Sequence, residues 1–501
     1  MAHQNPIISG FHPNPSICKV DDTYYLVTTS YHYFPSIPIY TSTDLINWRQ
    51  IGYCLSDKQK IKLDQAHSSA GILRSTIRNY KGTFYVVTTN ISNGGHFIIH
   101  TKNPSAEWSN PIPFPSIGGI DPSLFFDDDG TVYFTYSSGS HIQQFTIDLH
   151  SGKPLTESQP IWQGTGGQNP EAPHLYKFGD YYYLLITEGG TQYGRMVTLA
   201  RSKSPFGKFE AYPNNPILTH RSTNNPIQAL GYADITEDEK GKLWAVFSGI
   251  RPVSNKWHHL GGETFLAPVH QTNDNWLYIG NQGTVSFDID MKATDILPPS
   301  RDEIHDDFVL PELELWWNFI RTPHDSDWSL DSRPGWLRLN GSGLSLDAVD
   351  SPAFVGRRQQ HLRCTVTALL EFEPKNDHEE AGLTIYMDEK HHAEIGIIQL
   401  EGERYIIIRK RIGSLSTIVR LEEYSHHEVV IEIDSDPFWY QLSYHSMSNE
   451  KKTIASVETR YVSAEVTGSL TGVYLGMYAT GNGNVSEVPA YFDWFKYIAK
   501  D

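Results

Sequence analysis

The sequence of 501 residues predicts an all-β protein, with a five-bladed β-propeller over residues 1–300 followed by a β-sandwich over residues 301–501. Three observations support this prediction. Aromatic residues make up 12% of the chain, and 39 Gly and 29 Pro accompany them, which is typical of strands joined by tight turns. A pattern of turn and strand recurs five times in the first part. Short alternating segments fill the second part, and neither part contains a convincing amphipathic helix.

Each of the five repeats places Gly or Asp in a turn and an aromatic residue three positions later, as in GTFYVVTT. The five aromatic residues are Tyr25, Tyr85, Tyr133, Tyr183 and Trp244, at spacings of 60, 48, 50 and 61 residues. A second signal, a polar turn and then an aromatic residue, ends four of the units at Trp48, Trp108, Phe209 and Trp276. Units that pack only on their neighbours must close into a ring, which favours a propeller over the alternative of a two-sheet sandwich.

The repeat stops at the stretch DILPPSRDEIHDDF, which is rich in Pro and in charged residues. The domain boundary is therefore predicted near residues 296–306. Beyond it, alternating segments such as GLTIYMDE, RYIIIRKRI and VVIEID follow at short intervals, as in an antiparallel sandwich.

Composition excludes several classes of partner. Lys and Arg number 40 against 58 Asp and Glu, and the resulting charge of −18 disfavours binding to nucleic acid or to an anionic membrane. Three Cys without CxxC spacing predict neither a disulfide framework nor a zinc site, and they fit a reducing compartment. We find no signal peptide and no apolar run of about 18 residues, so a cytoplasmic location is expected unless a signal was removed. The oligomeric state stays open, a homo-oligomer included.

The innermost strands of a propeller converge on one end of its central channel. Three polar residues beside a proline, Asn14, Asp121 and Glu171, precede the repeated turns by about the same distance and should meet there. Two carboxylates and an amide directed at one place fit acid/base hydrolysis. The alternative is that these residues only mark the starts of strands in solvated turns.

The other motifs that we searched for indicate no further catalytic or binding site. The sequence has no GxSxG, HExxH or phosphate-loop motif. Paired histidines begin at His258, His391 and His426, all in turn-like contexts, and we expect them in solvated loops.

Several segments resemble glycoside hydrolase family 43, in its branch of β-xylosidases and α-L-arabinofuranosidases: NPIISGFHPNPSI, GGIDPSLFFDDDG, PEAPHLYKFGDYYYLLITEGGT, GGETFLAPV and YFDWFKY. The resemblance extends nearly end to end. It implies a five-bladed propeller followed by a concanavalin-like jelly roll. It also implies an exo-acting enzyme that removes terminal α-L-arabinofuranosyl or β-D-xylosyl residues from hemicellulose-derived oligosaccharides, with inversion and without a required cofactor.

Carried over by position, the resemblance makes Glu171 the general acid and Asp121 the residue that orients the acid and tunes its pKa. Inversion requires about 6.5–9.5 Å between acid and base, to admit a water. The base position holds Asn14 where the family has Asp. An amide cannot take a proton from water, and losing a general base costs about 10² to 10⁴ in rate.

Other positions also depart from the family pattern. Tyr232 stands where a His often lies beside an axial calcium, so that the calcium is disfavoured; Gly262 replaces a sugar-binding Arg, and Leu73 an aromatic platform. Several scattered changes favour natural divergence over a single deliberate Asp-to-Asn substitution at position 14. They also support an alternative function, a non-catalytic sugar-binding homologue that keeps the pocket.

The resemblance further implies a sugar-binding site around the catalytic positions. Aromatic faces stack on sugar rings and amides bond their hydroxyls. On this basis the residues expected to contact substrate are Tyr31, Phe34, Leu73, Gln228 and Tyr232.

Overall fold

The computed structural model describes residues 3–114, 117–190, 193–289, 291, 303–445 and 450–500. The all-β prediction is confirmed, because the only helical elements in these ranges are the 3₁₀ turn η1 (Thr459–Val462) and the single-turn helix α1 (Ala464–Thr467). No helix within the described ranges is long and apolar enough to cross a membrane.

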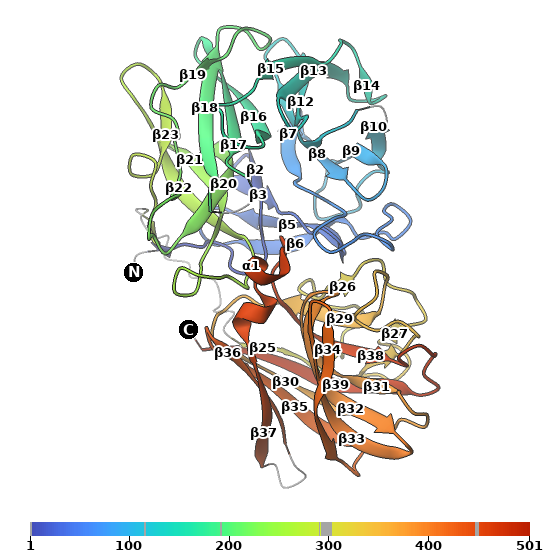
Figure 1. Ribbon diagram of the computed structural model, residues 1–501. Helices are drawn as coiled ribbons and strands as arrows, with labels where there is room; N and C mark the ends of the chain where they lie inside the picture. The colour runs from blue at the N-terminus through green and yellow to red at the C-terminus, as the bar shows by residue number, and fades with distance from the viewer. Residues whose placement is uncertain are drawn as a thin grey trace.

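The N-terminal part contains five antiparallel sheets that follow one another along the chain (Figure 1). The first is β2 (Ser16–Val20), β3 (Thr23–Val27), β5 (Ser36–Ser42) and β6 (Arg49–Leu55); the second is β7 (Thr76–Tyr80), β8 (Thr83–Asn90), β9 (Gly95–Thr101) and β10 (Ile112–Phe114). The third is β11 (Ile120–Phe126), β12 (Val132–Ser137) and β13 (Ile142–Asp148), with β14 (Lys153–Pro154) and β15 (Gln159–Trp162) both paired to β13. The fourth is β16 (Glu171–Phe178), β17 (Tyr181–Glu188), β18 (Met196–Ser202) and β19 (Glu210–Ala211); the fifth is β20 (Gln228–Glu237), β21 (Leu243–Ile250), β22 (Glu263–Gln271) and β23 (Leu277–Ile279).

The sequence repeat corresponds to the second strand of each sheet. The aromatic residues of the repeat lie in β3, β8, β12, β17 and β21, as predicted. The turn between β7 and β8 shows why the repeat begins with glycine: Lys81 and Gly82 have φ of 51° and 79°, and two consecutive left-handed residues make a tight hairpin turn.

The five sheets are neighbours in sequence order. Strand β7 contacts β2 and β11, β11 contacts β16, and β20 contacts both β17 of the fourth sheet and β2 of the first. The last sheet therefore lies beside the first. The strand β1 (His3–Gln4) pairs with β24 (Asp288–Ile289), so the two ends of this part of the chain are also joined.

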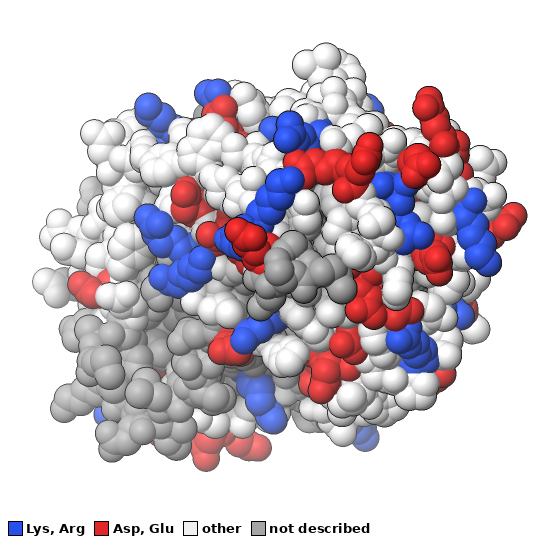
Figure 2. All heavy atoms as spheres, turned by 90° about the horizontal axis from the view of Figure 1, so that it is seen from below, with Lys and Arg blue, Asp and Glu red and all other residues white. Residues whose placement is uncertain are grey.

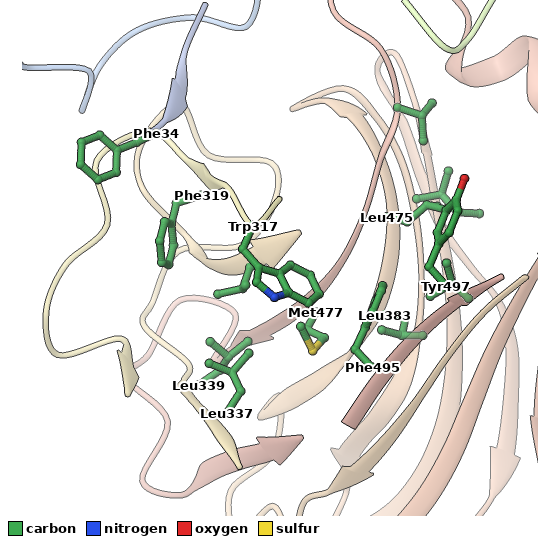
Figure 3. Packing of buried hydrophobic residues seen from close by; sticks show 14 of the residues in the cluster. Phe34, Trp317, Phe319, Leu337, Leu339, Leu383, Leu475, Met477, Phe495 and Tyr497 are labelled. Carbon is green, nitrogen blue, oxygen red and sulfur yellow. The ribbon is translucent and has the colours of Figure 1, made fainter. Parts of the chain in front are cut away.

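The C-terminal part is a sandwich of two antiparallel sheets. One contains β27 (Trp328–Ser329), β28 (Leu337–Asn340), β39 (Pro489–Ala499), β30 (Cys364–Glu371), β35 (Glu428–Ser435), β36 (Trp439–His445) and β37 (Lys451–Glu458), with β25 (Glu303–Asp306) on β39. The other contains β29 (Ala353–Arg358), β38 (Tyr474–Thr480), β31 (Glu380–Asp388), β32 (His391–Leu400), β33 (Glu403–Ile412) and β34 (Leu415–Glu423). Alternate residues of facing strands, such as Leu383 and Phe495, point inward and build the core (Figure 3).

The two parts share one interface. Strand β4 (Tyr33–Phe34) pairs with β26 (Phe319–Ile320), and one hydrophobic cluster includes residues of both parts. Two buried arginines of the C-terminal part donate to main-chain oxygens of the N-terminal part: Arg321 Nε to Ala66 at 2.6 Å and Arg358 Nε to Phe11 at 2.8 Å. Helix α1 projects from the sandwich toward the N-terminal sheets (Figure 1).

The predicted boundary at residues 296–306 falls mostly outside the described residues, which stop at 291 and resume at 303. The face of the molecule seen from below carries acidic and basic side chains interspersed, with no large area of one sign among its described residues (Figure 2).

Candidate active site

Irregular strand starts position the catalytic candidates. Pairing with the neighbouring strand shifts register directly after Ile120 in β11, after Glu171 in β16 and on both sides of Gly231 in β20. Asp121, Ala172 and Tyr232 have positive φ of 53°, 54° and 55° at these places. Left-handed backbone costs a non-glycine residue roughly 1–3 kcal/mol and concentrates at functional sites. These bulges direct polar side chains to one place, where a regular strand would alternate them.

The structure brings Asp121 and Glu171 together, and both are buried. The Tyr232 hydroxyl donates to Oε1 of Glu171 at 2.8 Å, and the Ala172 N–H donates to the Asp121 carboxylate. Oδ2 of Asp121 is buried without a hydrogen-bond partner among the described residues. An unpaired buried carboxylate oxygen costs free energy, which a substrate hydroxyl would recover.

Burial and neighbouring charges raise the pKa of both carboxyls, that of Glu171 to about 7 and that of Asp121 to about 6. Burial raises the pKa of Glu171, and the negative charge of Asp121 raises it further. Burial also raises the pKa of Asp121, but the Arg74 guanidinium and the Ala172 N–H act in the opposite direction. Glu171 is therefore the member of the pair that keeps its proton near neutral pH, as a general acid must.

Arg195 is a site residue that the sequence did not reveal. It is 8% exposed, its guanidinium carbon lies 4.8 Å from the centre of the Tyr232 ring, and its charge lowers the pKa of Glu171. Gly231 makes room for it, since a Cβ there would lie 2.4 Å from Cδ of Arg195. The sequence around Arg195, a single Arg after a glycine-rich turn, does not indicate that it belongs to the site. Its place there depends on Gly231, which lies 36 positions away.

A cavity of about 40 Å³ adjoins this site through Arg195, which lines it, whereas neither Asp121 nor Glu171 is among its lining residues. Asn14, which has φ of 57°, and Tyr31 line it and are hydrogen-bonded to each other. Further lining residues come from both parts of the chain: Pro13, Arg195, Ala229, Ser248, Ile250, His258, Gly262, Ala464, Ser469 and Leu470. The sandwich thus supplies one wall of the cavity.

The other predicted substrate-binding residues occupy varied positions. Tyr232 belongs to the site through its bond to Glu171, and Leu73 packs against the cluster that contains Tyr31. Phe34 does not line the cavity: it packs in the hydrophobic cluster at the interface, near Phe319 (Figure 3). Gln228 uses its amide nitrogen to hold the loop before β20, donating to the main-chain oxygens of Thr223 and Asn225.

The prediction that His258 lies in a solvated loop was wrong, and so was the same prediction for His391. Both are buried, as are the histidines that follow them, whereas His426 and His427 are exposed as expected. His258 is buried because the loop after β21 packs against the segment around α1. Its Nδ1 lies 2.8 Å from Oε1 of Glu465, a residue of that helix. Pairing with residues about 200 positions away is not visible in local sequence.

The centre of the five sheets is occupied by a charged network. Asp234 of β20 accepts hydrogen bonds from Ser16, Tyr176 and Arg78, and His174 of β16 contacts Arg78 and Arg74. Burial alone would raise the pKa of Asp234, but Arg78 and the other partners hold it well below its usual value. These residues come from four sheets, so they meet on the central axis.

This network does not fit an axial calcium ion. Two guanidinium groups already lie at the axis, and the Asp234 oxygens are satisfied by their protein partners. The Tyr232 hydroxyl is directed to Glu171 instead of the axis. Within the described residues, no group of three or more His, Cys, Asp or Glu side chains is placed to hold a metal.

Comparison with known proteins agrees with this geometry. The model of glycosyl hydrolases family 43 matches residues 3–277, and the model of the β-xylosidase C-terminal concanavalin A-like domain matches residues 305–498. A non-reducing end α-L-arabinofuranosidase of Bacteroides ovatus is 40% identical over 99% of this chain and 95% of its own length. A xylosidase/arabinosidase of Butyrivibrio fibrisolvens is 33% identical, covering 98% of each protein.

A solved structure described as Bacteroides ovatus xyloglucan PUL GH43B superposes with a TM-score of 0.95 at 38% identity, covering 100% of both chains. The buried pair of carboxyls, the all-β architecture and these matches lead to one conclusion. The chain is a glycoside hydrolase and belongs to glycosyl hydrolase family 43, with a concanavalin A-like C-terminal domain.

Proposed function

We propose that the protein is an exo-acting glycosidase that removes terminal α-L-arabinofuranosyl or β-D-xylosyl residues from hemicellulose-derived oligosaccharides, with inversion. The observation that carries the proposal is the buried pair of Asp121 and Glu171, in which Glu171 keeps its proton. The relatives described as arabinofuranosidase and xylosidase/arabinosidase support the choice of sugars.

The architecture supports exo action. We infer that the five sheets are the blades of a five-bladed propeller, that this domain extends to about residue 300, and that residues 301–501 form the sandwich domain. Ala464, Ser469 and Leu470 of the sandwich line the cavity beside Asn14. A site closed on one side by a second domain accepts the end of a chain and excludes its middle.

In the reaction that we propose, each residue of the site has its own role. A water attacks the anomeric carbon from the face opposite the leaving group and gives up a proton to a general base other than the Asn14 amide, and the glycosidic C–O bond breaks. Glu171 gives its proton to the leaving oxygen, while ionised Asp121 raises the pKa of Glu171 and holds the sugar through its unpaired Oδ2. Tyr232 fixes the orientation of the Glu171 carboxyl. No metal takes part in this sequence of steps.

The position of Asn14 favours a second candidate, a non-catalytic protein that binds the sugar but does not cleave it. Asn14 lies on the cavity wall and is hydrogen-bonded to Tyr31. Its amide can orient a water but cannot accept a proton from it.

An assay of four proteins separates the two candidates: the natural sequence, Asn14→Asp, Glu171→Gln and Asn14→Asp/Glu171→Gln, each with aryl α-L-arabinofuranosides and β-D-xylosides. We expect turnover by the natural sequence or by Asn14→Asp, and a loss of about 10² to 10⁴ when Glu171→Gln is added. The anomer first formed, observed by NMR, should be inverted. Sugar binding by calorimetry without any turnover, in the natural sequence and in Asn14→Asp, would establish the binding protein instead.

A further inference from the structure

The cavity beside Asn14 contains a histidine that has no role in the mechanism described so far. His258 lies between β21 and β22 and lines the cavity together with Asn14. The residue is 9% exposed, so it is buried within the protein.

A carboxylate from the other domain fixes the ring of His258. Oε1 of Glu465 lies 2.8 Å from Nδ1 of His258, and Oε2 accepts the His258 backbone N–H at 2.9 Å. The Tyr193 hydroxyl donates to Oε1 of the same carboxylate at 2.8 Å. Burial raises the pKa of Glu465, but the hydrogen bonds from His258 and Tyr193, together with the positive charge that His258 carries when protonated, outweigh burial and keep the pKa below its usual value. Glu465 is therefore ionised at neutral pH.

An ionised partner at Nδ1 determines the tautomer of the ring. In the neutral ring Nδ1 carries the hydrogen, because it donates to Glu465, and Nε2 then has a free lone pair. Hydrolases use this arrangement of carboxylate, Nδ1–H and basic Nε2 to produce a general base.

The other ionisable groups that line the cavity cannot serve as a base. Arg195 is a cation without a usable lone pair, and burial raises the pKa of Tyr31 well above its usual value, which keeps it protonated. Among the described lining residues, only His258 has a side chain with a basic nitrogen lone pair.

The cavity also has room for the reacting water. A water needs about 10–15 Å³ and two to four polar partners, and this cavity encloses about 40 Å³ and has the polar residues Asn14, Ser248 and Ser469 among those that line it. The cavity that Asn14 and His258 both line therefore has room for a water.

We propose that His258, held by Glu465 of the sandwich domain, is the general base of this enzyme in place of the carboxylate that position 14 lacks. The proposal rests on the proposed function. In the proton balance, the attacking water loses a proton to Nε2 of His258 and its oxygen bonds to the anomeric carbon. Glu171 protonates the leaving oxygen. His258 returns its proton to solvent after the sugar leaves, while Glu171 is reprotonated, so that both groups are restored.

The test compares His258→Asn in two backgrounds. In the natural sequence the substitution should lower kcat by about 10² to 10⁴, the usual contribution of a general base. In Asn14→Asp, where a carboxylate is restored, the same substitution should lower kcat by less than about tenfold. A structural role for His258 would give the same loss in both backgrounds, because folding and packing do not depend on which residue accepts the proton.

Two further variants support the comparison. Glu465→Gln keeps a hydrogen-bond acceptor for Nδ1 but removes the charge, and it should lower kcat in the natural sequence more than in Asn14→Asp. His426→Asn, at an exposed histidine, is the matched control and should change kcat in neither background. Melting temperatures confirm that each variant is folded.

The outcomes are distinguishable. Equal losses in both backgrounds overturn the role of His258, as does an inactive natural sequence beside an active Asn14→Asp, which leaves the proposed function intact. Absence of turnover in both the natural sequence and Asn14→Asp overturns the proposed function, and the role of His258 with it.

Discussion

Three neighbours of Glu171 set the pH at which it can act as an acid. Asp121 raises the pKa of Glu171, whereas Arg195 and the Tyr232 hydroxyl lower it. The alkaline limb of kcat/KM against pH reports this pKa in the free enzyme. We therefore expect Asp121→Asn to move the limb to lower pH, and Arg195→Met and Tyr232→Phe to move it to higher pH.

The control for these variants is Tyr278→Phe, since Tyr278 contacts His270 far from the site. Arg195→Met should also lower kcat/KM by about tenfold, because it removes a buried cation–π contact, worth roughly 2 kcal/mol, with the Tyr232 ring that orients Glu171. Displacement of the limb in the same direction by all three variants would contradict this account of Glu171.

For single residues, the sequence predicted those members of the site that lie close to the repeated pattern of turn and strand. Asp121 and Glu171 lie at the starts of β11 and β16, the strands directly before those that carry the repeated aromatic residues, so their convergence was predictable. Arg195 and His258 were not, because their contacts with Tyr232 and Glu465 join positions far apart in the chain. Phe34 was assigned to substrate because an aromatic side chain in a strand looks the same whether it faces a sugar or a core.

At the scale of elements, the main gap in the sequence prediction is α1. A four-residue helix is too short to show a hydrophobic period, although Gly468 with φ of 72° ends it in the usual left-handed conformation. The bulges in β11, β16 and β20 were equally invisible, since their composition does not differ from that of regular strands. Both features matter more for the site than the regular strands do.

The segment after α1 lies directly against the loop that carries His258. Val473 N–H donates to the His259 carbonyl at 2.8 Å, and a Cβ at Gly472 would lie 2.2 Å from the Leu260 carbonyl oxygen. Gly472→Ala must therefore push these two segments apart. We expect a loss of about 1–3 kcal/mol in unfolding free energy, as for other overpacked sites, and a lower kcat/KM.

Denaturant unfolding and initial rates measure both effects. Gly118→Ala is the matched control, because Gly118 has ordinary φ and open space around its Cβ position. A Gly472→Ala protein with unchanged stability would show that the two domains do not approach as closely as the structure has them.

For the whole molecule, the division into two all-β parts was predictable because each part repeats a simple pattern many times. The interface between them was not, since it depends on isolated residues such as Arg321 and on the short pairing of β4 with β26. The shared hydrophobic cluster includes Phe34 from one part and Trp317 from the other (Figure 3). The sandwich therefore completes the fold of the N-terminal part as well as the wall of its cavity.

This shared interface predicts that the two parts unfold together. Arg321 is fully buried; it donates to the Ala66 and Asp350 carbonyls and pairs with Glu389. Arg321→Met leaves the Glu389 carboxylate buried without its partner, which costs about 3–5 kcal/mol. Calorimetry should show one transition shifted to lower temperature.

In the control, Lys203→Met removes an exposed ion pair with Asp180 and should cost less than about 1 kcal/mol. Two separate transitions, of which Arg321→Met moves only one, would show that the domains are energetically independent, and a propeller expressed alone would then be expected to fold.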